Sequence, residues 1–309
     1  MLSNRTRVLL ATAVAPATWG TTYLVTTELL PPGRPLLAGV LRALPAGLLL
    51  LAIVRVLPRG SWWWRAAVLG TLNIGAFFAL LFVAAYRLPG GVAAIAGALQ
   101  PLLVAALATV VLRERLRLRT VGAGVAGVVG VALVVLTASA RLDAIGVAAA
   151  LAGAGSMAVG IVLAKRWTPP ASPLVTTSWQ LIAGGLVLTP VALLVEGPPS
   201  EVDAPAIGGY VYLSLVGTAL AYVLWFRGLA ALPAATTSFL SLLSPVVAVL
   251  AGWAVLGQGL SLFQLLGVAV VLAAVLVATR PTDRPADRAE APDLTRPVRY
   301  GTAPVDGTP

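Results

Sequence analysis

The stretch "PLLAGVLRALPAGLLLLAIV", from Pro35 to Val54, is twenty residues long and contains a single charged residue, Arg42. About 20 apolar residues is the length that an α-helix needs to cross the hydrocarbon core of a bilayer. A charge at that depth costs roughly 2.5–3.5 kcal/mol even on the scale derived from insertion experiments. The stretch therefore predicts a membrane-spanning helix in which one costly arginine has a role.

The composition of the chain is that of a membrane protein. Hydrophobic residues make up 59% and charged residues 10% of its 309 residues, against about 45–50% and about 25% in soluble domains. Cysteine and histidine are absent. This excludes disulfides and thiolate chemistry, and it excludes nearly every kind of zinc site, because such sites are built mainly from these two residues. The net charge of +10 is spread between apolar runs, so we interpret it as membrane topology and not as nucleic-acid binding.

Nine more apolar segments of spanning length accompany the first, which predicts an all-α integral membrane protein with ten transmembrane helices. We place the spans at 8–28, 35–54, 66–86, 90–112, 118–138, 144–164, 173–195, 206–226, 232–256 and 261–279. The stretch 280–309 is rich in Pro, Asp and Arg and has almost no large apolar residues. Such a segment cannot bury enough apolar surface to fold, so we expect a disordered cytoplasmic tail.

Basic residues gather in alternate connections between the spans, which sets the orientation of the chain. They are Arg5, Arg7, Arg55, Arg59, Arg65, Arg113, Arg115, Arg117, Arg119, Lys165, Arg166, Arg227 and Arg280. The other connections contain only Arg34, Arg87 and Arg141, next to several acidic residues. Because cytoplasmic loops carry the excess of Lys and Arg, both termini are predicted to be cytoplasmic, in a multi-pass protein of the plasma (cytoplasmic) membrane.

The chain contains an internal repeat. Residues 88–116 align without a gap with residues 232–260 at an offset of 144, and Pro89 and Pro101 meet Pro233 and Pro245. Residues 31–47 align with 169–185 at an offset of 138. Each copy holds five spans, an odd number, so the second copy enters the membrane from the opposite side. We therefore predict two inverted five-helix repeats, 1–140 and 141–279, a construction typical of secondary transporters.

The repeat places Pro101 and Pro245 inside spans four and nine. A proline within a helix removes a backbone hydrogen bond and can kink the helix. The sequence leaves open whether these two residues form fixed kinks used for packing or hinges of a gate.

Several stretches resemble the EamA-type transporters of the drug/metabolite transporter superfamily. They are "ATWGTTYLV" (Ala17 to Val25), "RPLLAGVLRALPAGLLLL" (Arg34 to Leu51), "LRERL" (Leu112 to Leu116) and "LGQGLSLFQLLG" (Leu256 to Gly267). The resemblance implies two inverted five-helix repeats around a central cavity lined by helices one to four and six to nine. It also implies export or exchange of small polar metabolites, often amino acids. The family often has Gly-Glu where this chain has Gly257–Gln258.

Polar residues recur at helical spacing in the spans other than five and ten. The candidate cavity residues are Arg42, Trp19, Tyr23, Asn73, Gln100, Gln180, Tyr222, Thr237 and Ser241. Serine and threonine also commonly bond their own helix or join neighbouring helices, so packing is the alternative for span nine. Arg42 either snorkels outward, binding Glu28 or backbone carbonyls, or faces the cavity and holds a substrate carboxylate or phosphate as a two-pronged donor.

We expect a secondary transporter of small polar metabolites such as amino acids or other carboxylates, working by alternating access. The alternatives are an exporter of uncharged or cationic drug-like compounds and a membrane protein without transport activity. An enzyme is disfavoured because the spans lack clustered acids, histidines or an activated nucleophile. We expect no cofactor, no metal and no nucleic-acid partner; the partners are a small-molecule substrate and the lipid bilayer, and a homodimer is left open. Glu28 is the only acid near an outer helix end that could couple transport to protons, and its place at the water interface disfavours that role. We therefore expect facilitative or exchange-type transport.

Overall fold

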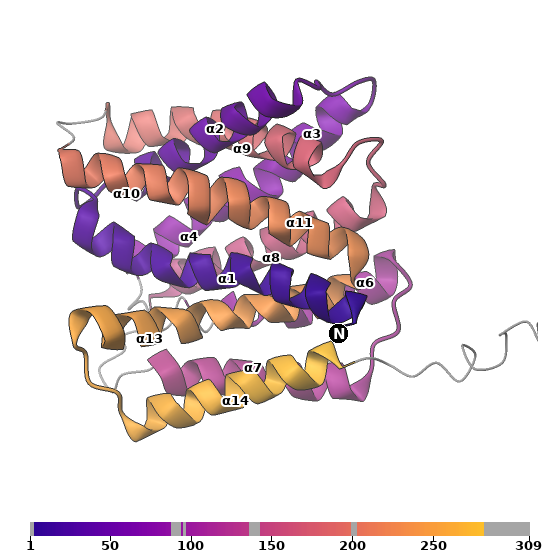
Figure 1. The fold of residues 1–309 in the computed structure, drawn as a ribbon, viewed down its shortest axis with the longest axis vertical. Helices are drawn as coiled ribbons and strands as arrows, with labels where there is room; N and C mark the ends of the chain where they lie inside the picture. Colours follow the sequence, from indigo (N-terminus) through magenta and orange to yellow (C-terminus); the bar gives the residue numbers. More distant parts are fainter. Residues whose placement is uncertain (1–2, 88–93, 95–96, 136–142, 199–202, 281–309) are drawn as a thin grey trace, which may run out of the picture. The chain divides into compact units, whose positions relative to one another are not determined.

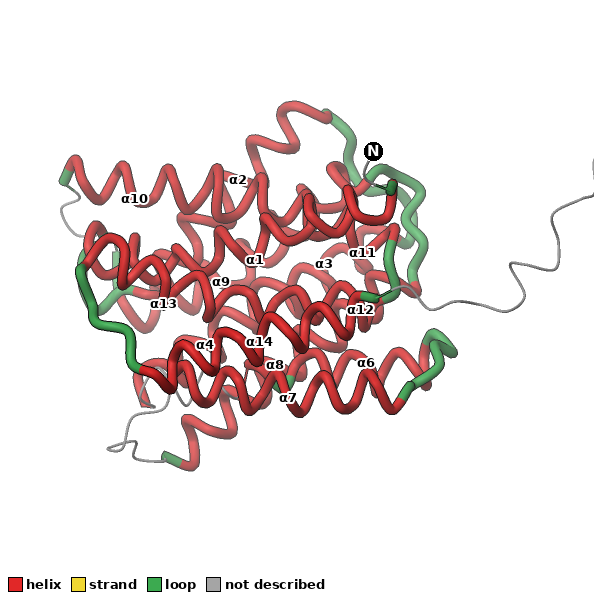
Figure 2. Tube along the Cα trace, turned by 60° about the horizontal axis from the view of Figure 1, so that its bottom comes forward, coloured by secondary structure: helices red, strands yellow, loops and turns green. Residues whose placement is uncertain are grey.

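The computed structural model describes residues 3–87, 94, 97–135, 143–198 and 203–280, and within these ranges every regular element is a helix (Figure 1, Figure 2). The elements are α1 (Asn4–Leu29), α2 (Pro35–Val54), α3 (Trp62–Gly70), η1 (Thr71–Gly75), α4 (Ala76–Arg87), α6 (Gln100–Val111), α7 (Leu118–Val135), α8 (Ala144–Arg166), α9 (Pro173–Glu196), α10 (Ala204–Ser214), η2 (Leu215–Leu220), α11 (Ala221–Ala231), α12 (Ala234–Phe239), η3 (Leu240–Leu242), α13 (Leu243–Leu256) and α14 (Leu262–Thr279). The elements η1 and η2 are π-helical, and η3 is a 3₁₀ turn.

Nine helices in the described residues are long and apolar enough to cross a membrane. The segment α3–η1–α4 forms one of the predicted spans, α10–η2–α11 a second and α12–η3–α13 a third. For the predicted span 90–112 the structure describes one helix of twelve residues, Gln100–Val111, and most of the preceding residues lie outside the described ranges. The all-α membrane class is therefore confirmed, and the number ten stays a prediction.

Carboxylates fix where several helices begin. The side chains of Asp143 and Asp203 accept hydrogen bonds from the backbone N–H groups of Gly146 (2.7 Å) and Ala206 (2.9 Å). Glu196, at the end of α9, accepts the first N–H groups of α2, with its two oxygens 2.6 and 2.8 Å from the nitrogens of Leu36 and Leu37. These groups have no partner inside their own helix, and a negative charge is favoured at that terminus.

Glycines bring pairs of helices into backbone contact. A Cβ at Gly20 of α1 would lie 2.5 Å from the carbonyl oxygen of Ser244 in α13. A Cβ at Gly267 of α14 would lie 2.6 Å from the carbonyl oxygen of Gly130 in α7. In Figure 1, α7 and α14 lie side by side at the lower edge of the helices. Small residues at such crossings are the usual basis of helix packing in membranes.

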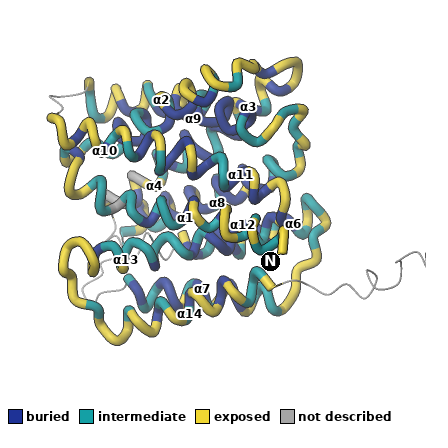
Figure 3. The backbone as a smooth tube through the Cα atoms, in the orientation of Figure 1, coloured by how far each residue is buried: buried dark blue, intermediate teal, exposed yellow. Residues whose placement is uncertain are grey.

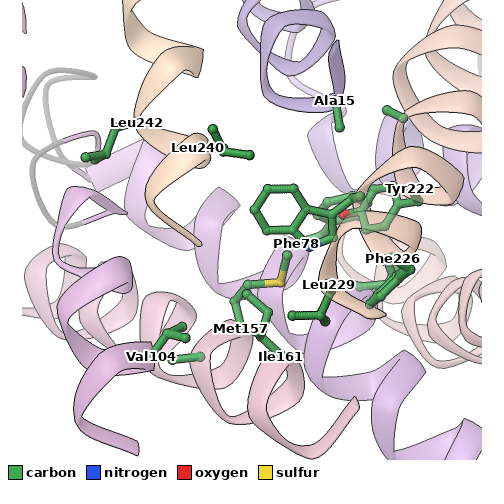
Figure 4. Close-up of a cluster of buried hydrophobic side chains, with 14 of the residues drawn as sticks. Ala15, Phe78, Val104, Met157, Ile161, Tyr222, Phe226, Leu229, Leu240 and Leu242 are labelled. Carbon is green, nitrogen blue, oxygen red and sulfur yellow. The ribbon is translucent and has the colours of Figure 1, made fainter. Parts of the chain in front are cut away.

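The apolar core lies between the helices, and their outer sides carry exposed apolar residues (Figure 3). One part of the core brings Met157 and Ile161 of α8 against Tyr222, Phe226 and Leu229 of α11 (Figure 4). The exposed residues include Leu194 and Leu276. An apolar exterior is expected where lipid and not water surrounds the helices.

Two backbone features recur at the offset of 144 found in the sequence. The π-helical segment η1 begins at Thr71 and η2 begins at Leu215. After α6, Arg113 has a left-handed backbone conformation with φ 57°, and after α13 Gly257 has φ 64°. The two halves of the chain therefore share local backbone geometry as well as sequence.

Each repeat-related proline follows an interruption of its helix. Pro101 is the second residue of α6, which begins after a turn at Leu99. Pro245 is the third residue of α13, which follows the 3₁₀ turn η3. Pro101 thus lies in the first turn of a helix, where a missing N–H costs little, and the break in regular α-helix precedes both prolines.

Candidate functional site

Arg42 joins α2 to the π-helical segment η2. Its Nε donates to the hydroxyl oxygen of Thr218 at 3.0 Å, and its Nη2 donates to the backbone carbonyl of Gly217 at 3.0 Å. The guanidinium also lies over the ring of Phe78, 5.1 Å from the centroid. Within the described residues these contacts engage two of the five guanidinium N–H donors. Arg42 is partly buried.

Aromatic side chains surround the same carbonyl. The indole Nε1 of Trp19 donates to Gly217 at 3.1 Å, so this oxygen receives two donors. The ring of Trp19 lies 5.2 Å, centroid to centroid, from both Tyr222 and Trp225. Tyr222 is 2% exposed and Trp225 is fully buried, with no hydrogen-bond partner for its Nε1 among the described residues. The predicted residues Arg42, Trp19 and Tyr222 therefore come together at η2, and we call this set the arginine node.

A second polar pair lies inside the protein. Asn73, in the π-helical segment η1, donates from Nδ2 to the Oε1 of Gln180 in α9 at 2.9 Å. Both side chains are buried, and Asn73 Oδ1 has no partner among the described residues. Gly160 of α8 faces this oxygen, since a Cβ there would lie only 2.0 Å from it. We call Asn73 and Gln180 the amide node.

The internal repeat relates the two nodes. The offset of 138 takes Arg42 to Gln180, and the offset of 144 takes Asn73 to Gly217. The bond from Arg42 in the first half to Gly217 in the second thus corresponds to the bond between Gln180 in the second half and Asn73 in the first. A reciprocal exchange of partners of this kind is what a two-fold relation between two copies produces.

The remaining predicted residues are not brought to either node by a hydrogen bond. Thr237 donates to the carbonyl of Pro233 at 3.2 Å and Ser241 to that of Ser238 at 2.7 Å, both on their own span. Gln100 is buried at the start of α6. The side chain of Tyr23 lies outside the described residues. The hydroxyls of Thr237 and Ser241 thus bond carbonyls of their own span in this conformation.

Four residues that contact the arginine node were not among the predicted site residues: Gly217, Thr218, Phe78 and Trp225. Thr218 and Trp225 share a helical face with Tyr222, and this spacing was the available signal. Gly217 contributes only a backbone carbonyl, and no side-chain pattern could identify it. π-Helical segments are rare and are frequently found at functional sites.

Charge at the arginine node is positive. No acidic side chain bonds Arg42 in the part of the chain that the structure describes. The same part contains no cluster of three or more His, Cys, Asp or Glu that could hold a metal. Glu28 is exposed at the end of α1 and accepts a hydrogen bond from the adjacent Thr27 (3.3 Å). Among the described residues, the charge at the node thus comes from the guanidinium of Arg42.

Comparison with known proteins agrees with this architecture. The model of the EamA-like transporter family matches the chain twice, over residues 6–136 and 144–280. "Protein PecM" of Dickeya dadantii (strain 3937) is 47% identical over 265 residues, which cover 85% of this chain and 89% of that protein. The "Uncharacterized inner membrane transporter YedA" of Escherichia coli (strain K12) is 29% identical over 272 residues, covering 84% and 87%.

A solved crystal structure has the same fold. It superposes with a TM-score of 0.78 at 21% identity and covers 89% of this chain and 97% of that chain. The apolar helices, the two matches of one family model and the extensive identity to PecM agree. This multi-pass membrane protein belongs to the EamA-like transporter family, within the drug/metabolite transporter superfamily.

Proposed function

We propose that this chain exports or exchanges small carboxylate-bearing metabolites, such as amino acids, by alternating access to a site at the arginine node. The family supports transport, and the reciprocal bonds of Arg42 and Gln180 support two inverted repeats, 1–140 and 141–279, around that site. Five spans per repeat give the ten helices and place both termini in the cytoplasm. Sites near the midplane between inverted repeats are typical of secondary transporters.

One observation carries the substrate class. The guanidinium of Arg42 lies over the ring of Phe78, and in the described residues it uses two of its five donors and has no acidic partner. An arginine held in this way binds a carboxylate through charge-assisted hydrogen bonds, which are about twice as strong as neutral ones. No carboxylate is available there to bind a cation, which disfavours cationic drug-like substrates. In addition, none of the acidic residues that the structure describes is buried. A buried acid for proton coupling is therefore absent from the described spans, which favours exchange.

Exchange in liposomes tests this proposal. Vesicles containing the purified protein are preloaded with amino acids and small carboxylates, and uptake of labelled carboxylates is followed for wild type, Arg42→Gln and Arg42→Lys. Because Arg42→Gln loses a charge-assisted bond to the substrate, its exchange rate should be at least about tenfold below that of wild type. The rate of Arg42→Lys should lie between those of wild type and Arg42→Gln. Arg59→Gln, at an exposed residue, is the matched control. A folded Arg42→Gln protein that exchanges carboxylates at the wild-type rate would refute the proposal.

A second candidate is the export of uncharged, drug-like compounds. It is favoured by the buried rings of Tyr222 and Trp225 and by the bonds that already hold Arg42 to Thr218 and Gly217. Arg42 would then act as a structural link between α2 and η2. In the same liposome assay, this second function predicts that the wild-type protein takes up neutral aromatic compounds. A folded Arg42→Gln protein should take them up as well.

A further inference from the structure

The end of α8 carries a lysine whose ammonium group is fully engaged by backbone carbonyls. Lys165 Nζ donates to the carbonyls of Leu229 (2.7 Å), Ala230 (3.3 Å) and Leu232 (2.6 Å). These residues form the last turn of α11 and the start of the connection to α12. Carbonyls at a helix C-terminus lack partners inside their own helix and favour a positive charge. Lys165 thus ties α8 to the end of α11.

Two neighbouring contacts extend this link to α6 and α12. Arg166 Nη1 donates to the carbonyl of Val111, the last residue of α6, at 3.0 Å. Glu114 Oε1 accepts the backbone N–H of Ala234, the first residue of α12, at 3.0 Å. The connection between α11 and α12 is therefore bound on one side by Lys165 and on the other by Glu114. We call Glu114, Lys165 and Arg166 the latch.

The internal repeat shows that the latch has no counterpart of the same chemistry. The two offsets take Lys165 to Thr27, Arg166 to Glu28 and Glu114 to Gln258. None of these counterparts is a cation that could bind helix-terminal carbonyls as Lys165 does. In the structure Thr27 donates to the carbonyl of Leu24 on its own helix, at 3.2 Å.

The opposite end of α1 also borders a hollow. Its volume is about 650 Å³, and Glu28, Leu30, Pro31 and Asp203 are among the residues that line it. The N-terminus of α1 and the connection between α13 and α14 lie at opposite ends of the helices (Figure 1). The end that carries the latch is the one with the excess of arginine and lysine in the sequence.

We propose that the latch is a gate that holds the arginine-rich, cytoplasmic end of the protein closed, and that breaking it shifts the conformational equilibrium toward opening at this end. Glu114, Lys165 and Arg166 bind helix ends and not the substrate, so they are gating residues. The proposal rests on the proposed alternating-access transport. Breaking the latch removes stabilisation only from the state that is closed at this end, and an equilibrium shifts by the change in the difference of stabilisation between its two states.

Cysteine accessibility tests the gate directly, because the natural chain contains no cysteine. Ser238→Cys places a thiol at a fully buried position on α12, one turn beyond Ala234. Thr26→Cys places one near the opposite end of α1, at a partly buried position. The rate of labelling by a membrane-impermeant maleimide is measured in vesicles of each orientation, with and without Lys165→Met. Arg115→Gln, at an exposed residue of the same connection as Glu114, is the control.

Lys165→Met should raise the labelling of Ser238→Cys from the cytoplasmic side about tenfold, the effect of losing roughly 1.4 kcal/mol. It should also slow the labelling of Thr26→Cys from the outer side, and Arg115→Gln should change neither rate. An unchanged rate at Ser238→Cys, or a rise there with no change at Thr26→Cys, overturns the gate. The second result would show that only the local connection has loosened.

Glu114→Gln keeps an oxygen that can accept the N–H of Ala234 but removes the negative charge. If Lys165→Met does not fold, Glu114→Gln replaces it in the labelling experiment. The expected rise in the labelling rate of Ser238→Cys is then smaller. Labelling measures access and not transport. Failure of the gate therefore leaves carboxylate exchange by Arg42 standing, and failure of the exchange assay leaves the labelling result intact.

Discussion

Gly160 of α8 is the position at which one added methyl group should most directly disturb the amide node. A Cβ there would lie 2.0 Å from Asn73 Oδ1 and 2.7 Å from its Cγ. Asn73 is fully buried and bound to Gln180, so its amide cannot move away without breaking that bond. Gly155, on the same helix, has no atom within 4 Å of the corresponding point. Gly155→Ala is thus a control for Gly160→Ala.

The expected size of the effect follows from three contributions. Alanine is favoured over glycine inside a helix by about 1 kcal/mol, and this gain applies to both variants. Overpacking a filled interior costs roughly 1–3 kcal/mol. Displacing Asn73 from Gln180 leaves buried amide groups without partners, which costs about 1–3 kcal/mol more. Gly160→Ala should therefore lower the free energy of unfolding by roughly 1–5 kcal/mol, while Gly155→Ala should leave it unchanged or raise it by up to about 1 kcal/mol.

Thermal unfolding in detergent, followed by tryptophan fluorescence, measures the difference. The double variant Gly160→Ala, Asn73→Ala removes the clash, so the part of the loss due to overpacking should return, while Gln180 stays without its partner. The interaction energy follows from the double-mutant cycle. The reasoning is wrong if Gly160→Ala unfolds at the same temperature as Gly155→Ala. It is also wrong if removing Asn73 gives no recovery.

Three shorter predictions concern helix ends and packing. Arg113→Gly should stabilise the protein by about 1 kcal/mol, because Arg113 has the left-handed φ of 57° that Gly257 provides in the second half; an unchanged unfolding temperature would contradict this. Gly267→Ala should destabilise it by roughly 1–3 kcal/mol, since a Cβ would meet the carbonyl of Gly130 at 2.6 Å, and normal stability would argue against that contact. Glu196→Ala should cost about 1–3 kcal/mol by leaving two N–H groups of α2 without a partner, as thermal unfolding will show.

The sequence was sufficient for the helices because in a membrane the length and apolarity of a segment dictate its structure. The predicted span 35–54 has the same bounds as α2. The pattern could not show the π-helical segments, because the residues of η1 (TLNIG) and η2 (LVGTAL) are of types that ordinary membrane-spanning α-helices also contain. In the predicted span 90–112 the structure gives the bounds of one helix, α6 (Gln100–Val111), so the full length of that span is still a prediction.

The candidate site was only partly predictable, for a similar reason. Helical spacing put Trp19 and Tyr222 on polar faces, and the depth of Arg42 marked it as unusual. Pairing could not be deduced, because a polar side chain in a span bonds equally well to its own helix or to another. Thr237 and Ser241 bond their own span, whereas Asn73 and Gln180 bond each other between η1 and α9.

The repeat explains why the two nodes differ in their bonding. At both nodes a residue of the second helix of one half reaches the π-helical segment of the other half. At the amide node two amides meet, and each is both donor and acceptor, so Asn73 and Gln180 can bond each other directly. At the arginine node the counterpart of Asn73 is Gly217, which offers only a carbonyl to a five-donor guanidinium. Two nodes that are nearly symmetric in their backbone contacts therefore differ in charge, because Arg42 stands at one of them and the neutral amides of Asn73 and Gln180 at the other.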